Sequence, residues 1–277
     1  MPLQSSGPIS LNDINIALGI ASATTISMNS TVVRGLLEVP TANSAISMSN
    51  AYGKANEIVF NISSQNNLNL RNYAVANGAS AYKRLIFNIN GNIGSTSTAL
   101  PAITTGTDWL AGTLITLNIA NGIYVVGAGG AGGNNGTGGA GGNAISLNHN
   151  ITIVNNGIIG GGGGGAGSQS LNALGFVTVG GGGGAGLVAG AAGVGSRNNV
   201  FVYGAAGSLT SGGVGCYRGG STSGQTVCTS DRGGGSLGQG GTSIPDGPGG
   251  GAAGKAIALN TYTATRPVVG TVFGDVS

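Results

Sequence analysis

Charged residues are scarce in this chain of 277 residues. Lysine and arginine together number 10 and aspartate and glutamate 7, so only 6% of residues are charged, against about 25% in ordinary globular proteins. The net charge of +3 is spread over single residues, and Lys83-Arg84 is the one adjacent basic pair in the sequence. The basic stripe that holds phosphates in nucleic-acid-binding proteins is missing. The composition therefore argues against a nucleic-acid partner.

Metal ligands and catalytic motifs are also few. One histidine, His149, and two cysteines are too few for a metal site of the usual composition, so we expect no metal and no cofactor. The carboxylates form no close acidic pair in sequence. The Gly-x-Gly-x-x-Gly pattern at residues 127–132 follows an apolar run, but the glycines behind it cannot form the helix that a dinucleotide site requires. These absences argue against an enzyme.

Signals for membranes and secretion are missing as well. No stretch of about 20 apolar residues predicts a membrane span. The first residues show no basic segment followed by an apolar run, so we expect synthesis in the cytoplasm without a classical leader. The two cysteines, Cys216 and Cys228, lie in one polar segment rich in glycine, serine and threonine. They form either a disulfide, which contributes about 3 kcal/mol, or two reduced thiols in a loop.

Glycine is the residue in excess, with 59 copies, or about one residue in five against roughly 7% in ordinary proteins. It concentrates between residues 127 and 254, where residues 160–165 and 180–184 are uninterrupted glycine runs. Glycine disfavours helices by about 1 kcal/mol per position and gives a strand no side chain to pack. Extended helices of three residues per turn pack side by side when no Cβ intervenes, and their backbone groups then bond one another. We therefore predict a sandwich of such polyglycine II helices.

The spacing of the glycines excludes two simpler structures. Collagen requires glycine at every third position without a break, and the spacing here is irregular. A flexible linker lacks apolar residues, whereas short apolar stretches such as Ile158-Ile159 and residues 200–203 recur between the glycine runs. The pattern is typical of glycine rods joined by structured turns.

Three segments divide the chain. Residues 1–55 predict short helices, the first of them over residues 11–18, capped by Ser10 or Asn12 and ended by Gly19. Residues 56–125 alternate apolar and polar residues between Asn-Gly turns, which predicts a small β-rich domain with one short helix ended by Gly78. Residues 126–277 form the glycine-rich domain with a closing C-terminal strand.

A short internal repeat occurs twice in the last segment. Residues 142–148 (GNAISLN) resemble residues 254–260 (GKAIALN). The similarity predicts two extended strands in equivalent positions that bracket the glycine-rich domain.

Inserts between the glycine runs carry nearly all the aromatic and arginine residues of this region. They span residues 168–179, 197–203 and 208–232. Tyrosine and arginine among serine, glycine and asparagine are typical of recognition loops. As an alternative, the aromatic side chains merely plug the ends of the scaffold. The candidate binding residues are Phe176, Arg197, Phe201, Tyr203, Tyr217, Arg218 and Arg232.

The glycine runs with short inserts, followed by the C-terminal sequence GKAIALNTYTATRPVVGTVFGDVS, resemble tail-fibre proteins of tailed bacteriophages. They are most similar to the tip adhesins of T-even-type long tail fibres, whose glycine-rich motifs form a polyglycine II sandwich. The phrases LQSSGPISLNDI and SMSNAYGK resemble virion-attachment segments, although residues 1–55 do not resemble the attachment domain of those tip adhesins.

The resemblance implies a receptor-binding protein of the virion. Loops between the glycine helices are then expected to bind a host outer-membrane protein or a surface glycan, and residues 1–55 to dock to other tail or fibre proteins. As alternatives, the chain is a purely structural tail component without receptor contact, an antifreeze protein or a fibre-borne depolymerase.

Overall fold

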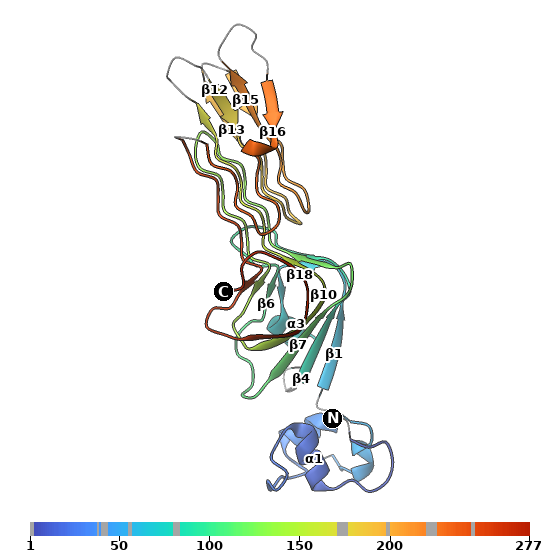
Figure 1. The fold of residues 1–277 in the computed structure, drawn as a ribbon. Helices are drawn as coiled ribbons and strands as arrows, with labels where there is room; N and C mark the ends of the chain where they lie inside the picture. Colours follow the sequence, from blue (N-terminus) through green and yellow to red (C-terminus); the bar gives the residue numbers. More distant parts are fainter. Residues whose placement is uncertain are drawn as a thin grey trace.

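The computed structural model of the chain describes residues 3–37, 39, 44–54, 57–79, 84–170, 177–197, 200–219, 226–244 and 247–277. The molecule is elongated, with short helices at one end, stacked strands in the middle and hairpins at the other end (Figure 1). Glycine-rich segments in extended conformation connect the strand stack to the hairpins. The prediction of a mainly β chain with a few short helices is confirmed.

Short helices form the N-terminal part: α1 (Leu11–Leu18), α2 (Thr31–Leu36) and the 3-10 helix η1 (Met48–Ala51). Helix α1 has the predicted ends, because the Ser10 hydroxyl accepts from the N–H of Asp13 and Gly19 adopts a left-handed φ of 71°. The Asp13 carboxylate in turn accepts from the hydroxyl and the N–H of Ser10. These two hydrogen bonds hold the pKa of Asp13 below its ordinary value.

The N-terminal part has a small core of its own. Arg34 is buried within it, and its guanidinium donates to the Asn29 side chain and to the carbonyls of Val39 and Ser44. A buried guanidinium is tolerated here because these acceptors replace water. The buried apolar residues of this core are Leu3, Ile14, Ala17, Leu18, Val33, Leu36, Leu37 and Ala51.

From residue 57 onward, successive turns of chain stack on one another as a parallel β-solenoid. All strand pairings in this stack are parallel. The first three turns contribute β1 (Glu57–Ile62), β2 (Gln65–Asn66) and β3 (Leu68–Asn69), then β4 (Arg84–Ile89), β5 (Ile93–Gly94) and β6 (Ile103–Thr104), then β7 (Leu114–Ile119), β8 (Tyr124–Val126) and β9 (Ile145–Ser146). The last turns contribute β10 (Ile151–Gly160), β17 (Ile257–Ala258) and β18 (Ala264–Phe273).

The alternating pattern of the strands explains the solenoid core. Inward positions of neighbouring strands stack in register, as Ile62, Ile89 and Ile119 do, and all three side chains are buried. Helix α3 (Leu70–Ala76) follows the first turn and adds Leu70 and Ala74 to this core. This is the short helix predicted from the sequence, and its end at Gly78, with a φ of 74°, is confirmed.

The predicted boundary between residues 125 and 126 does not separate two folded units. Strands β10 and β18, which lie beyond it, pair with each other, and β10 also pairs with β7 and β8. The glycine-rich segments are insertions inside solenoid turns, so the chain returns to the solenoid after each of them. The first insertion, 127–142, separates β8 from β9, and the second, 161–254, separates β10 from β17.

The two copies of the internal repeat form the strands that follow the two glycine-rich insertions, β9 and β17. Strands β9 and β17 lie side by side in register, with Ile145 opposite Ile257. The prediction of two strands in equivalent positions is therefore confirmed.

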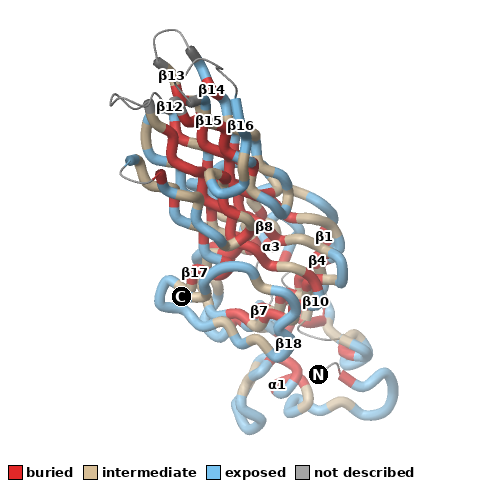
Figure 2. The backbone as a smooth tube through the Cα atoms, turned by 45° about the horizontal axis from the view of Figure 1, so that its top comes forward, coloured by how far each residue is buried: buried red, intermediate tan, exposed pale blue. Residues whose placement is uncertain are grey.

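Residues 160–168 form the centre of the glycine-rich layer, and all of them are buried (Figure 2). Every third N–H of this segment donates to the same neighbour: residues 162, 165 and 168 to segment 136–142, residues 163 and 166 to segment 182–185, and residues 164 and 167 to segment 239–242. Its carbonyls accept from segments 127–133, 235–238 and 251–254. Six segments therefore surround it through these bonds, and the N–H of Gly161 donates in addition to the carbonyl of Phe273.

Close approach of these segments requires glycine. A Cβ atom built on Gly163 would overlap the carbonyl oxygen of Gly235, and one built on Gly162 would overlap that of Ala128, in both cases well inside the 3.0 Å that real Cβ contacts respect. The space that a side chain would need is filled by the backbone of the next segment. The backbone hydrogen bonds between segments follow from this absence of side chains.

The far end of the molecule carries antiparallel strands, which we call the distal hairpins. One sheet has the order β11-β12-β15-β16, and β13 pairs with β14. The strands are β11 (Gln169–Ser170), β12 (Val177–Gly180), β13 (Val194–Arg197), β14 (Val200–Tyr203), β15 (Gly215–Gly219) and β16 (Thr226–Thr229), followed by the 3-10 helix η2 (Ser230–Arg232). None of the described helices has the length and apolar character required to cross a membrane.

Candidate functional site

The distal hairpins are the candidate binding site, because the chain leaves and re-enters the glycine-rich layer there. The three inserts singled out in the sequence, 168–179, 197–203 and 208–232, contribute described strands to this end of the molecule (Figure 1). The central glycine segment below them, residues 160–168, is hydrogen-bonded to the segments that surround it. The hairpins therefore stand on a stiff base, and a stiff base reduces the ordering entropy lost when a partner binds.

Phe201 and Tyr203 form an exposed aromatic pair on β14. They point to the same face of the strand, as residues two apart do, and are 56% and 62% exposed. Their ring centroids lie 6.5 Å apart with an interplanar angle of 23°. These two side chains do not plug the end of the scaffold, which was the alternative for them. They present an apolar stacking surface to solvent.

Tyr217 and Arg232 form a second pair. The Arg232 guanidinium carbon lies 5.1 Å from the centroid of the Tyr217 ring, in a cation–π arrangement. Arg232 comes from η2 and Tyr217 from β15, so the contact fixes η2 against the sheet. Arg218, the next residue on β15, is exposed. The hairpins thus combine aromatic surface with cationic groups.

The side chains of two predicted site residues lie outside the described part of the structure. Phe176 lies outside the described residues. Arg197 ends β13, opposite Val200 of β14, and its side chain is not among those the structure describes. The structure therefore groups Phe201 with Tyr203 and Tyr217 with Arg232. Arg218 follows Tyr217 on β15, and successive strand residues point to opposite faces of the sheet.

The two cysteines lie opposite each other on β15 and β16. Cys216 and Cys228 are in register, with their Cα atoms 4.0 Å apart. The structure places their sulfur atoms at bonding distance, which is the first of the two arrangements that the sequence left open. A bridge here closes the hairpin between Tyr217 and Val227, directly beside the Tyr217–Arg232 pair.

Potential metal ligands do not gather in the described part of the distal hairpins. Among the described residues, no group of three histidine, cysteine, aspartate or glutamate side chains is arranged to hold a metal ion. The distal hairpins offer rings, guanidinium groups, hydroxyls and backbone amides. This chemistry suits recognition of a partner surface.

Comparisons with known proteins identify the family of the chain and its fold. The family model described as phage tail fibre adhesin Gp38 matches residues 57–277. A crystal structure of the gp37–gp38 adhesin tip complex of the bacteriophage S16 long tail fibre has the same fold, with a TM-score of 0.56 at 24% sequence identity. The match covers 99% of this chain and 100% of that chain, so it includes the N-terminal helices that the sequence did not relate to a tip adhesin. No curated protein matches the sequence.

Proposed function

Because the chain belongs to the phage tail fibre adhesin Gp38 family, we propose that it binds a host cell-surface receptor through the distal hairpins. The adhesin role on a tail fibre follows from the family. The use of the hairpins as the receptor contact is the proposal, and its main support is the exposed Phe201–Tyr203 pair at the end remote from the N-terminal helices. The receptor is an outer-membrane protein or a surface glycan of the host, and the proposal involves no catalysis.

The scaffold below the hairpins is proposed to be a polyglycine II sandwich. The support is the repeat of three in the hydrogen bonds of residues 160–168. A helix of three residues per turn directs every third N–H the same way, which a pleated strand, with its period of two, does not do. Six neighbours around one rod is also the packing expected of such helices when side chains are absent.

The N-terminal helices are proposed to attach the adhesin to its fibre. Leu11 and Ile16 on α1 are 45% and 46% exposed, although the core beneath them is small. Apolar side chains exposed on a small core are typical of a surface that a partner covers. The solved neighbour is itself a complex of gp38 with gp37 of the long tail fibre, which supports a fibre protein as this partner.

Attachment is tested by replacing Leu11 and Ile16 with lysine. We expect the double variant to fold, because both side chains are exposed, and to be lost from purified virions, because two charges would be buried in the contact. Mass spectrometry of virions measures its incorporation. The control is Val75→Lys on α3, which is 47% exposed. Normal incorporation of the double variant would remove α1 from the attachment surface.

Receptor binding is tested on Phe201 and Tyr203. We expect the double variant Phe201→Ser, Tyr203→Ser to bind host cells at least about thirtyfold more weakly, since two aromatic anchors at about 1–2 kcal/mol or more each contribute at least about 2 kcal/mol together. Binding of labelled full-length chain to cells measures the affinity. The matched control is Phe273→Ser, because Phe273 is also exposed but lies on the solenoid.

Two outcomes would contradict the proposal. If the double variant and the control lose affinity equally, the hairpins are not the contact. If the wild-type chain does not bind cells, a purely structural role in the tail is the better reading.

A further inference from the structure

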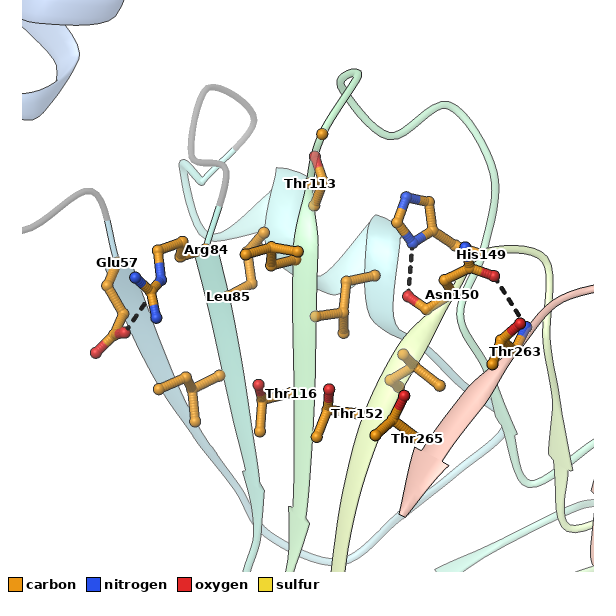
Figure 3. Close-up of a pocket in the computed structure, with 15 residues that line it drawn as sticks. Glu57, Arg84, Leu85, Thr113, Thr116, His149, Asn150, Thr152, Thr263 and Thr265 are labelled. Atoms are coloured by element: carbon orange, nitrogen blue, oxygen red, sulfur yellow. Dashed lines mark hydrogen bonds and ion pairs between the residues drawn. The ribbon is translucent and has the colours of Figure 1, made fainter. Parts of the chain in front are cut away.

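A groove on the outer face of the solenoid has no part in the proposed receptor contact. It has a volume of about 730 Å³ and lies at the starts of β4, β7, β10 and β18 (Figure 3). The groove belongs to the solenoid, and the distal hairpins lie at the far end of the glycine-rich layer (Figure 1). A ligand in the groove would therefore be held independently of the hairpins.

A row of threonines forms the floor of the groove. Thr116 pairs in register with Thr152, and Thr152 with Thr265, so the three side chains lie in one row across β7, β10 and β18 (Figure 3). Adjacent strands place them about 4.8 Å apart. Ile86 of β4 continues the row as an apolar neighbour.

The hydroxyls of this row are available to a ligand. Within the described part of the chain, none of the three makes an intramolecular hydrogen bond. The next row differs, because its asparagine side chains bond one another: Asn118 donates to Asn88 at 2.8 Å and Asn88 to Asn61 at 3.1 Å. The sheet thus carries one row that satisfies itself and one that leaves its donors and acceptors open.

Charge at the groove is nearly balanced. Arg84 lies 3.7 Å from Glu57, and both line one end. At the other end, His149 contacts the Asn150 carbonyl, and the Asn150 side chain accepts from the N–H of Thr263 (Figure 3). An anionic ligand would meet little net positive charge, because Glu57 lies beside Arg84. Open hydroxyls beside apolar Ile86 and Leu114 suit a neutral ligand with both hydroxyl groups and C–H surfaces.

From this arrangement we propose that the groove is a lateral saccharide site, which takes a neutral segment of host cell-surface polysaccharide. The threonine row would bond sugar hydroxyls, while Ile86 and Leu114 would pack against the C–H faces of the ring. The inference rests on the proposed host-surface function. It adds a second contact to it, since a long polysaccharide can reach the side of the adhesin while the hairpins reach the membrane.

The test uses full-length chain and delipidated surface polysaccharide from a strain to which the phage adsorbs, titrated by calorimetry or ligand-observed NMR. We expect the triple variant Thr116→Val, Thr152→Val, Thr265→Val to bind this probe about tenfold more weakly than wild type. Valine keeps the β-branched shape, so the strands should persist, and a melting curve checks this. Thr265→Arg, at an exposed edge position, fills the groove and should block binding by another route. Thr271→Val on β18 is the matched control.

The outcomes separate this proposal from the receptor contact. Loss of polysaccharide binding in the groove variants, with normal binding by Phe201→Ser, Tyr203→Ser, supports the lateral site. No binding by the wild-type chain, or equal binding by the groove variants, overturns it. Loss in the hairpin variant alone also overturns it, because the saccharide would then bind at the distal hairpins. The receptor contact of the distal hairpins is tested separately, by the binding of the hairpin variant to host cells.

Discussion

Gly163→Ala is expected to lower the free energy of unfolding by about 3 kcal/mol, the upper part of the range for overpacked cores. One added methyl group has this effect because its position is already taken by the carbonyl of Gly235 and approached to 2.8 Å by the Ala185 N–H nitrogen. Relief would require two hydrogen-bonded segments to move apart together. Each of them bonds further neighbours, so the strain cannot relax locally. Denaturant unfolding of purified chain measures the change.

Gly136→Ala is the matched control. The nearest atom to a Cβ at Gly136 is the carbonyl oxygen of Asn134 at 3.7 Å, an ordinary contact. Alanine there restricts the unfolded chain, so stability should stay the same or rise by about 0.5 kcal/mol. Opposite signs for one substitution type at two glycines would support the packing of six neighbours around residues 160–168. Equal effects at both positions would contradict it.

Reduction of the Cys216–Cys228 bridge is expected to destabilise the distal hairpins by about 3 kcal/mol, because a closed loop of this length restricts the unfolded hairpin by roughly that amount. Tyr217 lies next to Cys216, and its contact with Arg232 depends on the pairing of β15 with β16. Hydrogen exchange of the β15 and β16 amides, with and without reductant, measures the loss of protection. Binding to host cells should weaken in parallel.

The double variant Cys216→Ser, Cys228→Ser is the control for this measurement. It should show the low protection of the reduced chain, and reductant should have no further effect on it. Intact mass after alkylation without reductant should show no free thiol in the wild type. Two alkylated thiols in that experiment would mean that the bridge does not form in solution.

Local structure could be predicted from the sequence where local residues determine it. Helix α1 follows from Ser10, which caps it, and Gly19, which ends it, and both act within one turn of chain. The end of helix α3 at Gly78 has the same local origin. The extended character of the glycine-rich segments was predictable because helices and pleated strands are both disfavoured there.

Arrangements that depend on distant residues could not be predicted in this way. Alternating apolar residues give strands but do not distinguish a parallel solenoid from an antiparallel sheet, since the inward face alternates in both. Such a pattern also does not reveal the long insertion 161–254, across which Ile151 of β10 pairs with Ala264 of β18. This is why the sequence pattern does not show that the sheet continues across residue 125.

The candidate sites show the same division. Composition drew attention to Phe201, Tyr203 and Tyr217, because aromatic residues are rare among glycines. It gave no sign that Arg232 covers Tyr217. The groove was missed entirely: Thr116, Thr152 and Thr265 are ordinary strand residues in the sequence, and they form one row only through the register of three strands.

The order in which the chain is made has a consequence for the glycine-rich layer. The N–H of Gly161, at the start of the central segment, donates to the carbonyl of Phe273, four residues from the last residue of the chain. Strand β18 also supplies one side of β10. These contacts cannot form before residues 264–273 have been synthesised and have left the ribosome. Assembly of the layer therefore waits for strand β18, and a chain cut before residue 264 would leave the innermost glycine segment partly unbonded.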